Sequence, residues 1–166
     1  MARAGFGPAQ GRAEMASVTG MAIQTLSLLP RREASRVAVR FLTPTELKSG
    51  GGLASTPEFP VLFARIRDRL SILRALYGDG PLEIDFAAEA ERARDIRLVR
   101  CDTERVRLER RSSRTGLTHS LGGFTGEAEY EGDLTGFLPY LEAAQWTGVG
   151  RQTVWGKGEI EVRCLN

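Results

Sequence analysis

Hydrophobic and polar residues alternate over residues 36–42, and this period of two predicts a β-strand with one buried face. The apolar positions of that strand are Val37, Val39 and Phe41. A loop is expected over residues 43–56, because this stretch loses the alternation and contains three consecutive glycines.

A long helix is predicted next, because apolar residues then recur every three or four positions. The expected core face of this helix consists of Phe59, Leu62, Phe63, Ile66, Leu70, Leu73 and Tyr77. The helix should begin near Thr56 or Glu58 with a proline in its first turn, and Gly78 should end it.

The rest of the chain predicts four further elements before the last strand. These are a short helix at 86–94, a strand at 96–111 that turns at 112–118, a partner strand at 121–131, and a short amphipathic helix that packs as the second helix of the fold. That helix should begin near Asp133 or Thr135, or later because of Pro139, with Leu134, Phe137, Leu138 and Leu141 inward. With a closing strand at 159–164, the order β-α-β-β-α-β describes an α+β, ferredoxin-like fold, an antiparallel sheet with both helices on one face.

A glycine-rich loop precedes the closing strand and is the strongest indication of function. Its glycines follow the spacing G-x-G-x5-G-x-G, at Gly148, Gly150, Gly156 and Gly158. Glycine reaches positive φ and leaves its amide accessible. The interleaved Arg151 and Lys157 indicate a polymeric anion as the ligand. The order helix, loop, strand excludes a dinucleotide-binding fingerprint, and the residues around Lys157 do not fit a Walker A loop.

These residues resemble a known family. The segments Gly122-Gly123-Phe124-Thr125-Gly126, Tyr130-Glu131-Gly132-Asp133-Leu134 and the glycine-rich loop, with Phe41-Leu42-Thr43-Pro44 upstream, resemble the C-terminal domain of CRISPR-associated endoribonucleases that process precursor crRNA. These enzymes belong to the RAMP superfamily. The resemblance covers roughly residues 36–164.

The resemblance implies binding of CRISPR repeat RNA and metal-independent cleavage within the repeat by 2′-OH attack. It implies no cofactor, and other CRISPR effector subunits as further partners. In RNA-binding relatives of the fold, the open face of the sheet carries the RNA. The expected RNA-binding residues are Gly148, Gly150, Arg151, Gly156, Lys157 and Gly158.

An internal similarity bears on domain organisation. Residues 5–18 share the outline G-x-G, gap, G-[R/K]-x-E with residues 148–162. The similarity is either chance between two glycine-rich stretches or the end of a preceding, related domain. Family members carry two such domains in tandem, so we interpret residues 1–35 as a remnant plus linker and residues 36–166 as the RAMP domain.

The central hairpin has an uneven charge distribution. Residues 105–114 contain five arginines against one glutamate, and residues 124–133 contain four acidic residues and no basic one. Arg105 and Arg107 are therefore expected to pair with the glutamates across the hairpin. Near the tip, Arg110, Arg111 and Arg114 are predicted to contact RNA phosphates, because guanidinium groups match phosphate oxygens.

His119 is the only histidine and the candidate acid–base group. Imidazole can move a proton near neutral pH, as cleavage by a 2′-OH requires. The same residue could instead bond to backbone in the turn or contact RNA. In many family members the catalytic histidine lies in the first domain.

Composition also bears on metal binding, membrane insertion and cellular location. Two separated cysteines, Cys101 and Cys164, with a single histidine do not form a structural zinc site, and buried free thiols are expected. No stretch approaches the ~20 apolar residues of a membrane span. A cytoplasmic protein without a bound metal is therefore expected.

Two other functions remain open at this point. One is a non-catalytic crRNA-binding subunit of a CRISPR effector complex with the same fold. The other is a ferredoxin-like interaction domain with no role in RNA binding.

Overall fold

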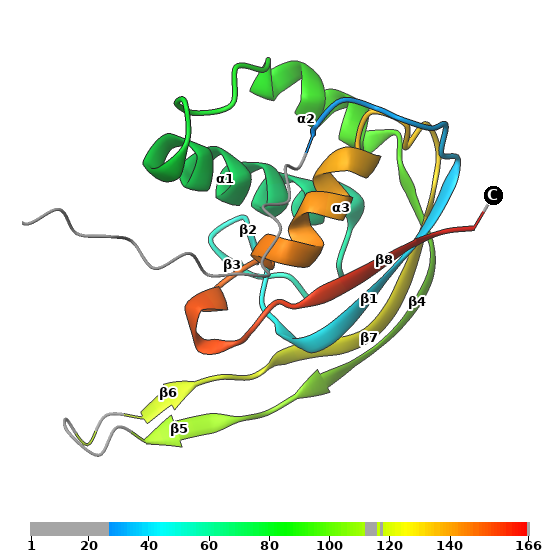
Figure 1. Cartoon of the computed structure of the whole chain (residues 1–166). Helices are drawn as coiled ribbons and strands as arrows, with labels where there is room; N and C mark the ends of the chain where they lie inside the picture. Colours follow the sequence, from blue (N-terminus) through cyan, green and yellow to red (C-terminus); the bar gives the residue numbers. More distant parts are fainter. Residues whose placement is uncertain (1–26, 112–115, 117, 166) are drawn as a thin grey trace, which may run out of the picture.

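A four-stranded antiparallel sheet covered by helices on one face forms the body of the protein (Figure 1). This is a computed structural model, and it describes residues 27–111, 116 and 118–165. The strands are β1 (Arg36–Thr45), β4 (Arg97–Val106), β7 (Gly123–Glu131) and β8 (Ile160–Cys164), in the spatial order β4-β7-β1-β8. With α1 (Phe59–Tyr77) and α3 (Leu138–Thr147), this order confirms the ferredoxin-like fold.

Smaller elements extend this core. Helix α2 (Phe86–Arg94) has the predicted bounds, because the carboxylate of Asp85 caps the amides of Ala87 and Ala88. The loop after β1 contains a short hairpin of β2 (Lys48–Ser49) and β3 (Gly52–Leu53). Its two turn glycines both have positive φ, as a two-residue hairpin loop requires.

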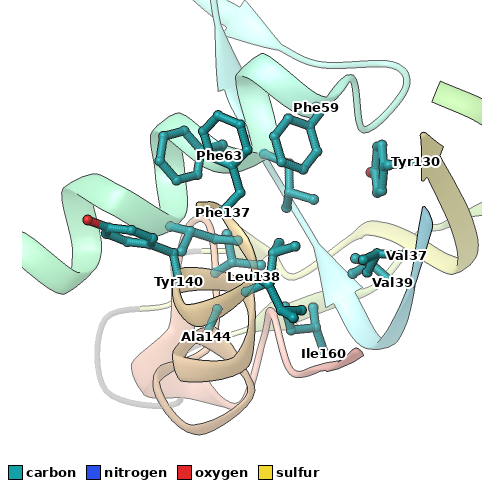
Figure 2. Close-up of a cluster of buried hydrophobic side chains, with 14 of the residues drawn as sticks. Val37, Val39, Phe59, Phe63, Tyr130, Phe137, Leu138, Tyr140, Ala144 and Ile160 are labelled. Carbon is teal, nitrogen blue, oxygen red and sulfur yellow. The ribbon is translucent and has the colours of Figure 1, made fainter. Parts of the chain in front are cut away.

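Aromatic side chains fill the space between helices and sheet (Figure 2). The ring of Phe137 lies 5.2 Å from that of Phe59 and 4.7 Å from that of Phe63, both with edge-to-face geometry. Buried Tyr130 donates from its hydroxyl to the carbonyl of Pro57 at 2.6 Å, so its polar atom is satisfied. The core therefore joins β7 to the start of α1 and to the segment before α3.

The predicted core face of α1 is correct for its first three turns only. Phe59, Leu62, Phe63, Ile66 and Leu70 are buried. Leu73 is half-buried, and Tyr77 is 84% exposed, because the last turn of α1 extends beyond the part of the helix that the core covers. Helix α3 begins at Leu138 with a proline in its first turn, and its four predicted inward residues are all buried.

The central hairpin divides into two parts. The sheet pair β4–β7 is followed by a separate extension, β5 (Glu109–Arg111) paired with β6 (Thr118–Ser120), which projects beyond the sheet (Figure 1). The expected pairing of Arg105 and Arg107 with the glutamates of β7 is wrong. The register places Arg105 opposite Phe124, so the glutamates lie farther along the strand.

Other arginines neutralise the glutamates of β7. Arg97 pairs with Glu131 at 2.6 Å and Arg163 with Glu127 at 2.6 Å. Glu129 receives both Arg36 at 2.6 Å and Arg100 at 3.1 Å. The open face of the sheet thus carries ion pairs that link β7 to each of the other three strands.

The charge of this open face is balanced. From the strand registers, its basic residues are Arg36, Arg40, Arg97, Arg100 and Arg163, and its acidic residues are Asp102, Glu104, Glu127, Glu129, Glu131 and Glu161. No aromatic side chain lies among the positions of these four strands that point to this face. The face thus lacks both the positive charge and the stacking surfaces with which sheets bind single-stranded RNA.

Both described cysteines are free thiols, as expected, but their predicted burial is wrong. Cys101 is exposed because it lies on the edge strand β4, and Cys164 near the end of β8 is half-buried.

Glu129 should make stability depend on pH. The hydrogen bond from Arg36, followed by that from Arg100, lowers the pKa of Glu129 below its ordinary value. A lowered folded-state pKa adds stability above the unfolded pKa of about 4.3, and that stability is lost as pH falls through the folded value. Urea unfolding should therefore find Glu129→Gln less stable than wild type at pH 7, with the difference closing in acid.

Glu161→Gln is the matched control, because Glu161 lies on the same face and makes no ion pair within the described residues. An equal loss of stability in both variants at pH 7 would contradict the role assigned to Glu129.

Candidate functional site

The glycine-rich loop between α3 and β8 folds back onto the end of β1 and the residue that follows it. The amide of Gly158 donates to the carbonyl of Pro44 at 3.2 Å, and the amide of Arg151 donates to the carbonyl of Glu46 at 3.0 Å. Within the loop, the amide of Val149 donates to the carbonyl of Gly158 at 2.8 Å. These bonds fix the two ends of the loop to each other and to β1.

The four glycines adopt the predicted positive φ. The φ angles are 70° at Gly148, 87° at Gly150, 81° at Gly156 and 75° at Gly158. A Cβ at Gly150 would collide with the carbonyl oxygen of Glu46, and one at Gly158 with that of Val149. At Gly156, a Cβ would meet no atom within 4 Å. The close approach that the spacing indicated is therefore, for two glycines, an approach to the protein's own backbone.

Lys157 is the internal anchor of the loop. The sequence led us to expect an exposed side chain, but the residue is 4% exposed. Its Nζ donates to the carbonyl of Gly122 at 2.6 Å and to Oε1 of Gln152 at 3.0 Å, and it pairs with Oε2 of Glu46 at 3.2 Å. Its three donor positions are therefore used within the protein, and the ammonium joins the loop to the base of the hairpin.

Arg151 has the opposite environment. Its backbone is fixed through Glu46, while its side chain is 46% exposed. The distance from Nη1 to Oε2 of Glu46 is 3.5 Å, at the outer limit of a hydrogen bond, and Glu46 is closer to Lys157. Arg151 therefore presents a guanidinium to solvent from a rigid backbone position.

A cavity of about 320 Å³ lies beside this anchor, at the base of the hairpin extension. Glu46, Arg105, Arg107, Glu109 and Gly122 are among its lining residues. Arg105 also reaches the carbonyl of Ala54 at 3.4 Å. The base of the hairpin thus belongs to the same region as the glycine-rich loop.

The predicted site residues of the hairpin itself lie farther out. Arg110 and Arg111 lie on β5, and Arg110 is the register partner of His119 on β6. Arg114 is outside the described residues, as are residues 1–26 of the segment 1–35 that was interpreted as a domain remnant plus linker. The structure therefore locates the backbone of His119 and the two arginines on the projecting hairpin.

Sequence analysis did not identify Glu46 as part of the site. It follows the first strand in a loop, where nothing in the local pattern distinguishes it. It also did not single out the tryptophans beside the loop. Trp146, in the last turn of α3, is 70% exposed, and Trp155, in the short 3-10 turn Thr153–Trp155, is 46% exposed.

Two features are absent from the described residues. They contain no group of three or more His, Cys, Asp or Glu side chains arranged to hold a metal ion. In the same part of the chain, no helix has the length and hydropathy needed to cross a membrane.

The sequence matches the model of a known protein family. The sequence model of the CRISPR-associated endoribonuclease Cas6 matches residues 39–160. None of the curated proteins matches the chain.

Solved structures share the fold. The Cas6 of Thermus thermophilus is 21% identical with a TM-score of 0.60, over 80% of this chain and 55% of that one. A Cas6 product complex is 22% identical with a TM-score of 0.58, over 82% of this chain and 54% of that one. A Cas6-RT-Cas1–Cas2 complex is 16% identical with a TM-score of 0.57, over 79% of this chain and 14% of that one. At these identities the likeness concerns the fold, and the chain spans about half the length of the first two.

The surroundings of Gly150 and Gly156 predict that alanine at these two positions lowers the free energy of unfolding by different amounts. Gly150→Ala and Gly156→Ala should each cost about 1 to 2 kcal/mol for a left-handed alanine. Gly150→Ala should lose more stability, because its new methyl group must also displace the backbone at Glu46. Urea unfolding of both variants measures this difference, and equal stabilities would show that the loop does not depend on contact at Gly150.

Alanine substitution of Lys157 and of Arg151 should lower the free energy of unfolding by different amounts in the same assay. Lys157→Ala leaves buried Glu46 without its nearest cation and should cost about 3 kcal/mol. Arg151→Ala removes an exposed side chain with a long contact and should cost less than about 1 kcal/mol. The double variant Lys157→Ala with Glu46→Gln should recover part of the loss, and no recovery would show that the pair is not the anchor.

Proposed function

The chain belongs to the family of the CRISPR-associated endoribonuclease Cas6, and from this premise we propose that it binds CRISPR repeat RNA and acts in the cleavage of precursor crRNA. The observation that carries the proposal is the glycine-rich loop. Its backbone is fixed by Glu46 and Lys157, so the exposed guanidinium of Arg151 is held in a defined position. Such a cation binds phosphate oxygens with little loss of freedom on binding.

The loop and the hairpin provide two further sources of contact in this proposal. Gly156 and the exposed Trp155 form the outer part of the loop, where bases of a single strand can stack, whereas Gly148 lies at the end of α3 against Gly158. Arg110 and Arg111 lie on the projecting hairpin, with Arg114 beyond the described residues. Lys157 acts indirectly, by fixing the loop, rather than through contact with the ligand.

The proposed reaction needs no bound metal. The 2′-oxygen of one nucleotide attacks the adjacent phosphorus, the bond from phosphorus to the 5′-oxygen breaks, and a 2′,3′-cyclic phosphate forms. One group must remove the proton of the 2′-OH and one must protonate the leaving 5′-oxygen. His119 is the candidate for such proton transfer, as the only imidazole of the chain.

The test measures binding and cleavage of repeat RNA by the chain in EDTA. We expect binding to both the normal repeat and a repeat with a 2′-deoxy substitution at the cleavage site. Any cleavage should persist in EDTA and be abolished by the 2′-deoxy substitution. If His119 moves the proton, His119→Ala should lower the cleavage rate about 10²- to 10⁴-fold with unchanged affinity.

The other outcomes are equally informative. Binding without cleavage would favour the second function, a crRNA-binding subunit of a CRISPR complex. Cleavage that EDTA abolishes would contradict the metal-independent mechanism. No affinity for repeat RNA at low salt would contradict the proposed function itself.

A further inference from the structure

A basic groove lies on the helical side of the molecule, between α1, the β2–β3 hairpin and the glycine-rich loop. One hollow of about 230 Å³ is lined by Lys48, Arg65, Asp68, Arg69, Ile72, Gly150 and Arg151. A second of about 400 Å³ extends it along the hairpin and shares Lys48 and Arg65 with the first. We call this surface the α1 groove. Four of its lining side chains are cationic and one is anionic.

Lys48 and Arg69 have no anionic partner in the groove. Within the described part of the chain, neither forms an ion pair. Nε of Arg69 instead donates to the carbonyl of Thr147 at the end of α3. Partial burial without a carboxylate partner among the described residues lowers the pKa of Arg69.

Arg65 is only partly satisfied by its surroundings. Its Nη2 lies 3.0 Å from Oδ2 of Asp68, but Asp68 is shared with Arg67 at 2.9 Å. Nε of Arg65 is buried and has no acceptor among the described residues. Within the described residues, the charge of Arg65 is therefore compensated only in part, by a carboxylate that a second arginine shares.

The arginines on the open face of the sheet differ from the cations of the α1 groove. On the open face, Arg36, Arg97 and Arg163 each lie 2.6 Å from a glutamate. On α1 itself, Arg67 is held by Asp68 and by the ring of Phe86, with its guanidinium carbon 4.4 Å from the ring centroid. These four arginines thus have partners, whereas the α1 groove retains an excess of positive charge.

We propose that the α1 groove binds the phosphodiester backbone of the RNA strand that contacts Arg151, and so extends the RNA path from the glycine-rich loop along α1 to the β2–β3 hairpin. The inference rests on the proposed function and specifies where the bound strand runs. Continuity supports it, because Gly150 and Arg151 of the loop form one wall of the groove. The turn at Gly50 and Gly51 borders the far end, where added Cβ atoms would meet nothing within 4 Å.

Binding of labelled single-stranded repeat RNA over a range of salt concentrations tests the proposal. The double variant Lys48→Ala with Arg65→Ala removes two groove cations. Each lost phosphate contact should lower the salt slope by about 0.7 and the affinity about fivefold near 0.1 M salt. We therefore expect a loss of about 25-fold and a slope smaller by about 1.4.

The matched control removes the same charge elsewhere. Arg74→Ala with Arg94→Ala changes two exposed arginines outside the groove, and affinity should fall by no more than about twofold because distant exposed charges are screened. Lys48→Glu distinguishes a loss of binding from a loss of folding. Lys48 is exposed on a short hairpin, so reversing its charge should weaken binding without lowering the melting temperature.

The outcomes separate the two proposals. If wild type binds, Arg151→Ala weakens binding, and the groove double variant retains wild-type affinity and slope, the groove proposal is overturned while the proposed function stands. That result would indicate another anionic partner for the groove. Equal losses in the groove and control variants would also overturn it. If wild type binds no repeat RNA, both proposals fail.

Discussion

The buried contact between Glu46 and Lys157 is the interaction on which the candidate site depends. Two buried charges are costly unless each is fully paired, and here the ammonium of Lys157 also donates to the carbonyl of Gly122 and to the side-chain oxygen Oε1 of Gln152. The contact joins three segments that lie far apart in sequence: the end of β1, the base of the hairpin and the glycine-rich loop. With this anchor inside, Arg151 can project outward from a backbone that has little freedom to move.

The anchor also explains the glycine spacing. Gly150 and Gly158 are the positions at which the loop lies against the backbone of Glu46 and Val149, so a side chain there would separate the surfaces that the anchor brings together. Gly156 lies in the outer part, where positive φ alone is required. One motif therefore combines two demands, close internal packing at its ends and an accessible turn between them.

Local patterns predicted most of the fold and part of the site. The periodicity of α1 and the capping aspartate of α2 are short-range signals, so the bounds of these two helices were predictable almost to the residue. The burial of Lys157 was not, because it depends on Glu46, more than a hundred residues earlier in the chain. The ion pairs predicted for the hairpin were wrong for a similar reason. The numbers of charged residues suggested pairs between β4 and β7, but the strand register, which places Arg105 opposite Phe124, decides which residues meet.

Analogy with other sheets of this fold would place RNA on the open face, but fold alone does not assign a surface. On that face most arginines are already paired with glutamates of β7, as at Glu129, and RNA phosphates would have to displace carboxylates that are held at short distance. Around Arg69 and Lys48 no such exchange is needed, because within the described residues neither side chain forms an ion pair. The sign of the unpaired charge, more than the topology, therefore favours the helical side of the molecule as the surface on which a polyanion lies.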